Sequence, residues 1–158
     1  MRYLLAVFAA LAITGCGGSS SGTPKGDPKD AAVKVLNQIV HNHYTEAWDD
    51  LHPADQAVAP RVEYVNCESR SPVIAIPVTV RPVGVKDESI GLGDGTFVQS
   101  KAVSLRLDFE GGFAVTHTVH LVASHGAWKW ILPSWRFRDY KADRCPTDAG
   151  SSPAPSQS

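Results

Sequence analysis

Residues 113–121 alternate apolar and polar side chains, and His117 stands in the middle of the apolar set. In a β-strand this alternation places Val115, His117 and Val119 on one face. A histidine among apolar side chains can act as a general base, because burial can move its pKa toward the working pH. The other interpretation is a core histidine bonded to a tyrosine, a backbone group or water. Spacing alone pairs no carboxylate with His117.

Aromatic side chains could complete a pocket around His117. Tyr44 and Trp48 lie four residues apart, so a helix would present both on one face. Trp128 and Trp130 lie two residues apart and would share one face of a strand. We therefore expect these four aromatic residues to line the pocket with His117.

The six histidines of the sequence do not indicate a metal-binding site. His41 and His43 would point about 200° apart on a helix, and no cysteine or carboxylate joins them at ligand spacing. No metal site and no cofactor is predicted. His52 precedes a proline and is expected at a turn or a helix cap, whereas His120 should face away from His117, toward solvent or a partner.

The first element that would position these residues is a long helix. Asp27 is a good N-cap, and Pro28 suits the first helical position. Apolar residues then recur at spacings of three and four as far as Leu51, which predicts one amphipathic helix of about 24 residues. Shorter helices are expected over 53–58 and 60–69, the second with Val62, Val65 and Cys67 among its inward candidates.

Strands follow the helices. An edge strand is expected over 78–85, because the prolines around it lack a ladder donor. Alternation then predicts strands over 102–109, 113–121 and 128–132, joined by glycine-containing turns. Residues 135–141 interleave basic and aromatic side chains and are expected to form a terminal strand with an exposed cationic face; contact with anionic headgroups is a second interpretation. Helices followed by antiparallel strands indicate the α+β class.

Size and charge limit the functions that this chain could have. Its 158 residues provide one compact domain with tails, which excludes a large multidomain enzyme. The formal charge of −1 offers no attraction to nucleic acid, which is not expected as a partner. No internal repeat is present, so a solenoid is not expected.

Residues 1–15 have the layout of a secretory signal, with Arg2 before an apolar run that is too short to cross a bilayer. The run ends in Ile13-Thr14-Gly15-Cys16, which resembles the lipobox of bacterial lipoproteins. The resemblance implies cleavage before Cys16, a diacylglyceryl group on its sulfur, and residence on the extracytoplasmic face of the cell membrane. The alternatives are an ordinary signal peptidase cut nearby or a buried amino-terminal helix. Loss of Arg2 would change the formal charge from −1 to −2.

Four segments follow from this interpretation. Residues 1–15 are the signal peptide, 16–26 the lipidated cysteine and a flexible linker, 27–145 the folded domain, and 146–158 a disordered tail. The linker from Gly17 onward carries no large apolar side chain and would act as a tether of about 18 Å.

Lipidation of Cys16 would leave two thiols, Cys67 and Cys145. Outside the cytoplasm such a pair tends to oxidise, so we expect a disulfide between them. A catalytic cysteine would need a nearby histidine and a site that favours the thiolate, and neither is visible in the sequence.

The order of elements, the segment over 47–54 and the closing Gly126-Ala127-Trp128-Lys129-Trp130-Ile131 strand resemble a nuclear transport factor 2-like domain. The resemblance covers roughly residues 30–140 and implies a cone, in which a curved antiparallel sheet wraps around the long amino-terminal helix and the short helices pack on it. A cystatin-like sheet on one helix is the nearest rival. The family includes isomerases, dehydratases and non-catalytic lipoproteins, and the aspartate base of its isomerases matches no position here.

The sequence is therefore compatible with three functions. The first is a lipid-anchored envelope protein, without catalytic activity, whose cone binds a small apolar ligand or an envelope protein. The second is a pocket enzyme of the isomerase or dehydratase type with His117 as general base. The third is a structural module that forms homodimers through an exposed sheet face.

Overall fold

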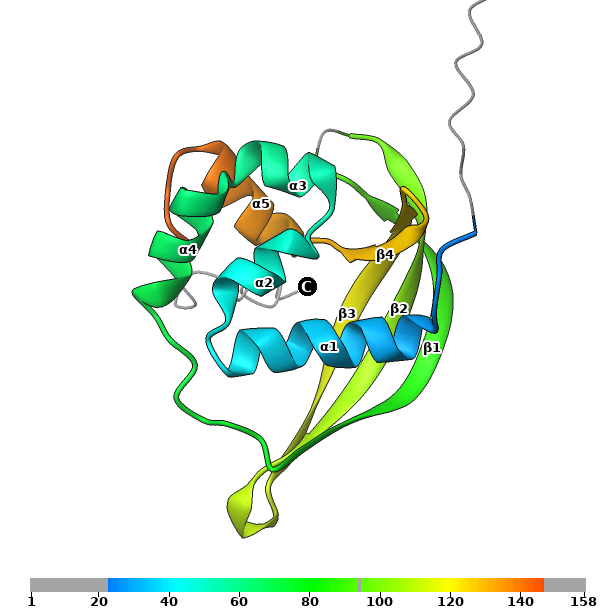
Figure 1. Ribbon diagram of the computed structural model, residues 1–158, viewed down its shortest axis with the longest axis vertical. Coiled ribbons are helices and arrows are strands. Elements are labelled where there is room, and N and C mark those ends of the chain that lie inside the picture. Colours follow the sequence, from blue (N-terminus) through cyan, green and yellow to red (C-terminus); the bar gives the residue numbers. More distant parts are fainter. Residues whose placement is uncertain (1–22, 94, 147–158) are drawn as a thin grey trace, which may run out of the picture.

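The computed structural model of the protein describes residues 23–93 and 95–146 (Figure 1). The expected signal peptide, Cys16, the expected linker as far as residue 22 and the tail from residue 147 onward lie outside these residues. The described chain contains four α-helices, then four strands with a short 3-10 helix between the second and the third, then a last α-helix. The elements are α1 (Pro28–Val40), α2 (Tyr44–Asp49), α3 (Pro53–Val58), α4 (Arg61–Ser69), β1 (Thr79–Gly91), β2 (Phe97–Asp108), the 3-10 helix η1 (Glu110–Gly112), β3 (Ala114–Ser124), β4 (Ala127–Trp130) and α5 (Ser134–Lys141). The α+β class is confirmed.

The strands form one antiparallel sheet in the order β1-β2-β3-β4, which confirms the predicted meander. The sheet is curved, and α1 lies across its inner face (Figure 1). Leu105 of β2 and Leu121 of β3 are fully buried there against α1 residues such as Ala32 and Leu36, whereas Val115 and His117 in the first half of β3 are exposed. Burial of these apolar side chains joins the helical layer to the sheet.

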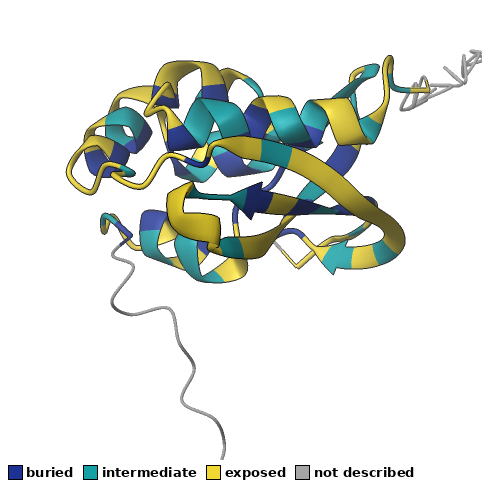
Figure 2. Cartoon of the chain, turned by 90° about the horizontal axis from the view of Figure 1, so that it is seen from below, coloured by how far each residue is buried: buried dark blue, intermediate teal, exposed yellow. Residues whose placement is uncertain are grey.

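The edge strand β1 is longer than the sequence suggested, and most of its residues are exposed (Figure 2). It pairs with β2 along its whole length, with a register shift between Pro82 and Gly84. A bulge at this point accommodates the proline, which has no N–H to donate. β1 therefore follows the curvature of the sheet and stays paired with β2 (Figure 1).

The predicted helix of about 24 residues is wrong, because α1 ends at Val40. It begins as expected, with the Asp27 side chain accepting a hydrogen bond from the Lys29 N–H at 2.8 Å. At the other end Asn42 adopts the left-handed conformation, with φ of 61°. The Asn42 N–H donates to Ile39 and the His43 N–H to Gln38, which is the Schellman pattern of helix termination.

Residues 135–141 were expected to form a strand, and this prediction is also wrong, because they belong to helix α5. Phe137 and Tyr140 are three residues apart and buried together, so the segment follows helical and not strand spacing. Phe137 packs so closely on Gly93 that a Cβ there would lie 2.1 Å from its ring. The glycine in this turn is therefore required for α5 to pack.

The short helices match their predicted positions, but one inward residue does not. In α4, Val62 is 74% exposed, whereas Tyr64 is fully buried. Glu68 of the same helix accepts hydrogen bonds from Tyr140 at 2.6 Å and from Arg136 at 2.5 Å. Burial, and then the negative charge of Glu68, raise the pKa of Tyr140 above its usual range. These bonds fasten α5 to α4.

The predicted disulfide between Cys67 and Cys145 is present. Its two Cα atoms lie 5.1 Å apart, within the ordinary range for a disulfide. The bond ties α4 to the chain that follows α5.

Candidate functional site

A cavity of about 550 Å³ lies between α1 and β3. Its walls come from α1, the end of β1, four consecutive residues of β3, and the chain that runs from β4 into α5. The lining residues are Val35, Ile39, Ile90, Gly91, 117–120 and 130–134. Most of these side chains are apolar, which is typical of ligand pockets of this volume.

Two parts of the chain, α1 and the segment that follows β4, form walls of the cavity. Val35 and Ile39 lie four residues apart on α1, so both point to the same side of the helix. Trp130 is buried, and its indole Nε1 donates to the Ala47 carbonyl oxygen at 2.7 Å. Beyond it the Leu132 N–H donates to the buried Asp55 carboxylate at 3.3 Å, which directs the chain away from the sheet toward α5.

His117 stands at the cavity, on the side of β3 that also carries Val119 and Leu121. Unlike those two core residues, its side chain is exposed. The protein atoms around the ring partly remove it from water, and this desolvation lowers the pKa of His117 below the usual 6.5; the charge of nearby His120 lowers it further. At neutral pH the site therefore presents an uncharged imidazole.

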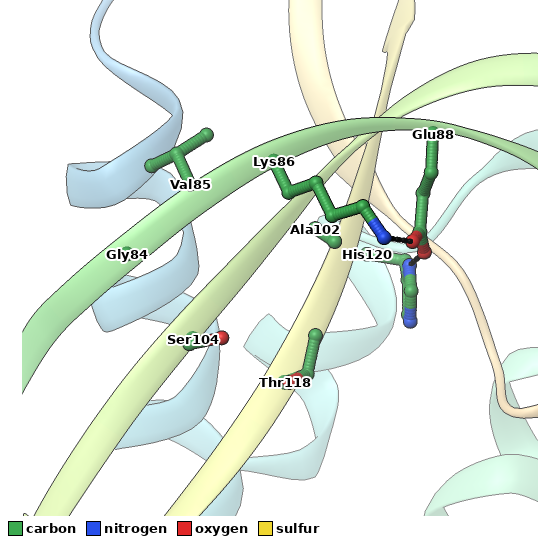
Figure 3. Close-up of a pocket in the computed structure, with 8 residues that line it drawn as sticks. All are labelled: Gly84, Val85, Lys86, Glu88, Ala102, Ser104, Thr118 and His120. Carbon is green, nitrogen blue, oxygen red and sulfur yellow. Dashed lines mark ion pairs between the residues drawn. The ribbon is translucent and has the colours of Figure 1, made fainter.

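His120 also lines the cavity, but its side chain lies on the outer side of the sheet, as alternation predicted (Figure 3). Its Nδ1 lies 2.8 Å from Glu88 Oε1. The other carboxylate oxygen of Glu88 lies 3.9 Å from the Lys86 ammonium. His120 is thus paired with an acid of β1, away from His117.

A second hollow, of about 500 Å³, lies on the outer face of the sheet (Figure 3). Its floor is made of small side chains from three neighbouring strands, with Gly84 paired to Ser104 and Ser104 paired to Thr118. Lys86, Glu88 and His120 gather at one end of it. This hollow has no wall of helices, and it is more polar than the cavity beside α1.

The structure brings only Trp130 and His117 together at the cavity. Tyr44 is buried elsewhere, and its hydroxyl donates to the Asn42 side chain at 2.5 Å. Trp48 donates its indole N–H to the Ala59 carbonyl, and Trp128 donates to the Gly26 carbonyl at the end of the expected linker. These three aromatic residues fix loops and helices and do not line the cavity.

Sequence reasoning missed the aliphatic side of the site. The sequence pattern predicted an apolar helix face without singling out Val35 or Ile39, and nothing in the spacing of apolar residues separates a cavity wall from a filled core. Leu132 was placed on a strand with Trp130, although the strand ends at Trp130. Pro133, which has no N–H to donate, is the signal that could have shown that the chain leaves the sheet there.

The lining of the cavity offers few groups that could take part in acid–base chemistry. The only titratable side chains in it are His117 and His120, and the second is paired with Glu88. General acid–base catalysis commonly uses two groups, one that accepts a proton and one that donates a proton. Within residues 23–93 and 95–146, no group of three His, Cys, Asp or Glu residues could hold a metal ion.

No known protein family and no curated protein sequence matches the chain. None of the helices that the structure describes has the length and apolar composition needed to cross a bilayer.

Proposed function

We propose that this chain is a lipid-anchored cell-envelope protein whose domain is a nuclear transport factor 2-like cone that binds its ligand without chemical conversion. The cavity beside α1 is the observation that carries the proposal. A curved antiparallel sheet around one helix, with shorter helices at the end, agrees with such a cone. The observed α1 is shorter than the helix that the sequence predicted, so the support comes from the order and layering of the elements.

The lining defines what the cavity can take. No Lys, Arg, Asp or Glu side chain lines it, so a charged ligand group would lose its hydration without gaining an ion pair. Aliphatic walls from Val35, Ile39 and Leu132 favour an apolar ligand, and His117 offers it one neutral hydrogen-bonding group. A small apolar molecule or an apolar segment of an envelope protein meets these requirements.

The extracytoplasmic location is supported by two independent features. The sequence around Cys16 resembles a lipobox, and two acyl chains provide a stable membrane anchor. The disulfide between Cys67 and Cys145 is typical of proteins in oxidising compartments. The anchor would leave the domain on the outer side of the cell membrane.

Two alternative functions are weaker. An isomerase or dehydratase with His117 as base would need a second catalytic group, and His120 is paired on the other side of the strand. A purely structural dimerisation module predicts a filled cone, and an open cavity of about 550 Å³ argues against it.

Titration with N-phenyl-1-naphthylamine, a neutral apolar fluorophore, tests the proposal. The wild-type chain should bind it saturably, and Ile39→Trp should weaken binding roughly tenfold or more by filling the cavity. Val62→Trp makes a slightly larger change in size at an exposed helix position and should bind like the wild type. Absence of saturable binding, or equal weakening by both variants, would reject a ligand-binding cavity.

A further inference from the structure

The cavity lies along an open edge of β3. β4 pairs with β3 only from Leu121 to Ser124, and Ile131 adds one hydrogen bond to the carbonyl oxygen of His120. The chain then turns away at Pro133 to form α5. Within the described residues, the part of β3 over 114–119 therefore has a partner strand on one side only, which is β2.

Two observations show which backbone groups point to this open edge. The carbonyl of His120 accepts from Ile131 on the β4 side, and the carbonyl of Phe113 accepts from the Phe109 N–H on the β2 side. In an antiparallel strand the N–H and C=O of one residue point to the same side, and the side alternates along the chain. The N–H and C=O of Thr116 and Thr118 therefore face the open edge, and both residues are exposed.

The cavity also extends around the open edge of β3 and is lined by residues from both faces of this strand. His117 and Val119 point to the inner face and His120 to the outer face, yet all of them line the same cavity. α1 borders it on the inner side, and Ile90 borders it near the outer face, where this residue packs with Val122 and Ile131. The space is therefore where a further strand, continuing the line of β4, would lie.

We infer that the cavity takes an extended, uncharged segment of a partner protein, which adds to the edge of β3 as a strand. This inference rests on the proposed binding function and names its ligand class. The backbone of such a segment would pair with Thr116 and Thr118, and alternate aliphatic side chains would enter the cavity against Val35 and Ile39. Strand addition gives affinity through the main chain, whereas the pocket selects the side chains.

The composition of the cavity and of the chain itself supports a separate partner. The lining carries no Lys, Arg, Asp or Glu, which favours an uncharged segment. The carboxy-terminal residues 147–158 of this chain contain Pro153 and Pro155 and no aliphatic side chain larger than alanine. Prolines lack ladder donors, so this segment is poorly suited to the site.

Amide hydrogen exchange of the full chain, followed by NMR, tests strand addition directly. The probe is a capped hexapeptide of alternating threonine and leucine, which carries no charge. At saturation, exchange at the Thr116 and Thr118 amides should slow by at least about tenfold, because each gains a hydrogen bond. The amides of Val115 and His117 face β2 and are internal controls, which should change little.

Two further ligands separate this inference from the proposed function. The same peptide with its alternate edge-facing amides methylated keeps its side chains and should fail to bind. If N-phenyl-1-naphthylamine binds while neither peptide protects Thr116 and Thr118, or if both peptides bind equally, strand addition is wrong and the cavity proposal survives. If no ligand binds, both fail.

The chain itself provides a matched pair of variants. Thr116→Pro removes the outward N–H, which an edge position tolerates, as Pro82 does in β1. Thr116→Val keeps that N–H, so peptide affinity should fall about tenfold more in the proline variant. An unchanged melting temperature in Thr116→Pro shows that the fold is intact. Protection of Thr116 and Thr118 by concentration alone would identify a second copy as the occupant and overturn the inference.

Discussion

The Asn42 side chain forms hydrogen bonds with both the backbone N–H and the backbone C=O of Val73. The Asn42 Nδ2 donates to the Val73 carbonyl oxygen at 3.2 Å, and the Val73 N–H donates to Asn42 Oδ1 at 2.9 Å. The same residue ends α1 in the left-handed conformation. One side chain thus fixes both the end of the helix that lines the cavity and the segment that leads into β1.

Replacement of Asn42 should separate its conformational role from its side-chain bonds. Asn42→Gly keeps the left-handed backbone but loses both bonds to Val73 and the bond from the Tyr44 hydroxyl, so unfolding should cost about 1 to 3 kcal/mol less. Asn42→Ala loses the same bonds and adds a conformational penalty of about 1 kcal/mol. Urea denaturation measures both. Lys29→Ala, at an exposed position of α1, should be neutral, and equal effects of the Gly and Ala variants would contradict this account.

The disulfide should supply a large part of the stability of the domain. Cys67 and Cys145 are 78 positions apart, and closing a loop of this size stabilises the fold by about 4 to 5 kcal/mol in the chain-entropy estimate. Urea denaturation with and without reductant should therefore show a large loss on reduction. A variant with both cysteines replaced by alanine should be equally unstable and insensitive to reductant. Identical denaturation midpoints for the wild type in the two conditions would rule out this role.

Ligand binding should weaken as His117 becomes protonated. Its pKa is lowered by desolvation, so the ring is neutral above 6.5 and gains a charge at the cavity only at lower pH. The affinity for N-phenyl-1-naphthylamine should stay constant above pH 6.5 and fall as the pH is lowered through the folded pKa of His117. His117→Gln should remove most of this dependence, whereas His120→Gln should retain it.

The same shift has a consequence for stability. Because the folded pKa of His117 lies below that of the unfolded chain, the unfolded chain takes up the proton first as the pH falls. The contribution of His117 to the free energy of unfolding is present above pH 6.5 and is lost as the pH falls through its folded pKa. An NMR titration of the imidazole that gives a pKa above 6.5 would reverse both expectations.

The anchor at Cys16 is tested by the intact mass of protein purified from the membrane fraction. The chain should start at Cys16, carry a diacylglyceryl group, and gain the mass of two protons on reduction of its disulfide. Cys16→Ala should leave the chain unlipidated. A wild-type chain that retains Met1 and carries free thiols would place the protein in the cytoplasm and remove the support for an envelope function.

Structural features that depend only on residues close together in the sequence could be predicted. Asp27 and Pro28 mark the start of α1, and His52 before Pro53 caps α3, where its ring accepts from the Ala54 N–H at 3.3 Å. Alternation predicted the inward residues of β2 and, in β3, Val119 and Leu121, whereas Phe113 and Val115 were expected inside and are exposed. These signals persist because local backbone preferences and the tertiary structure agree.

Features that depend on distant contacts could not be predicted. The apolar spacing of three and four continues through residues 41–43, and it hides a helix break that Asn42 stabilises by bonds to Val73. Helix α5 is fastened by Glu68, a residue distant in the sequence, which accepts hydrogen bonds from Tyr140 and Arg136. The cavity likewise depends on where β4 ends beside β3, and alternation in a single strand cannot reveal its missing neighbour.

The central claim, that the cavity beside α1 is the ligand site, is tested most directly by methyl NMR during titration with N-phenyl-1-naphthylamine. The methyl groups of Val35, Ile39, Val119 and Leu132 should shift with one common saturation curve, because all four line the cavity. Val85, which lines the outer hollow only, should remain unchanged. Shifts at Val85 without shifts at Val35 and Ile39 would place binding on the outer face of the sheet and contradict the account.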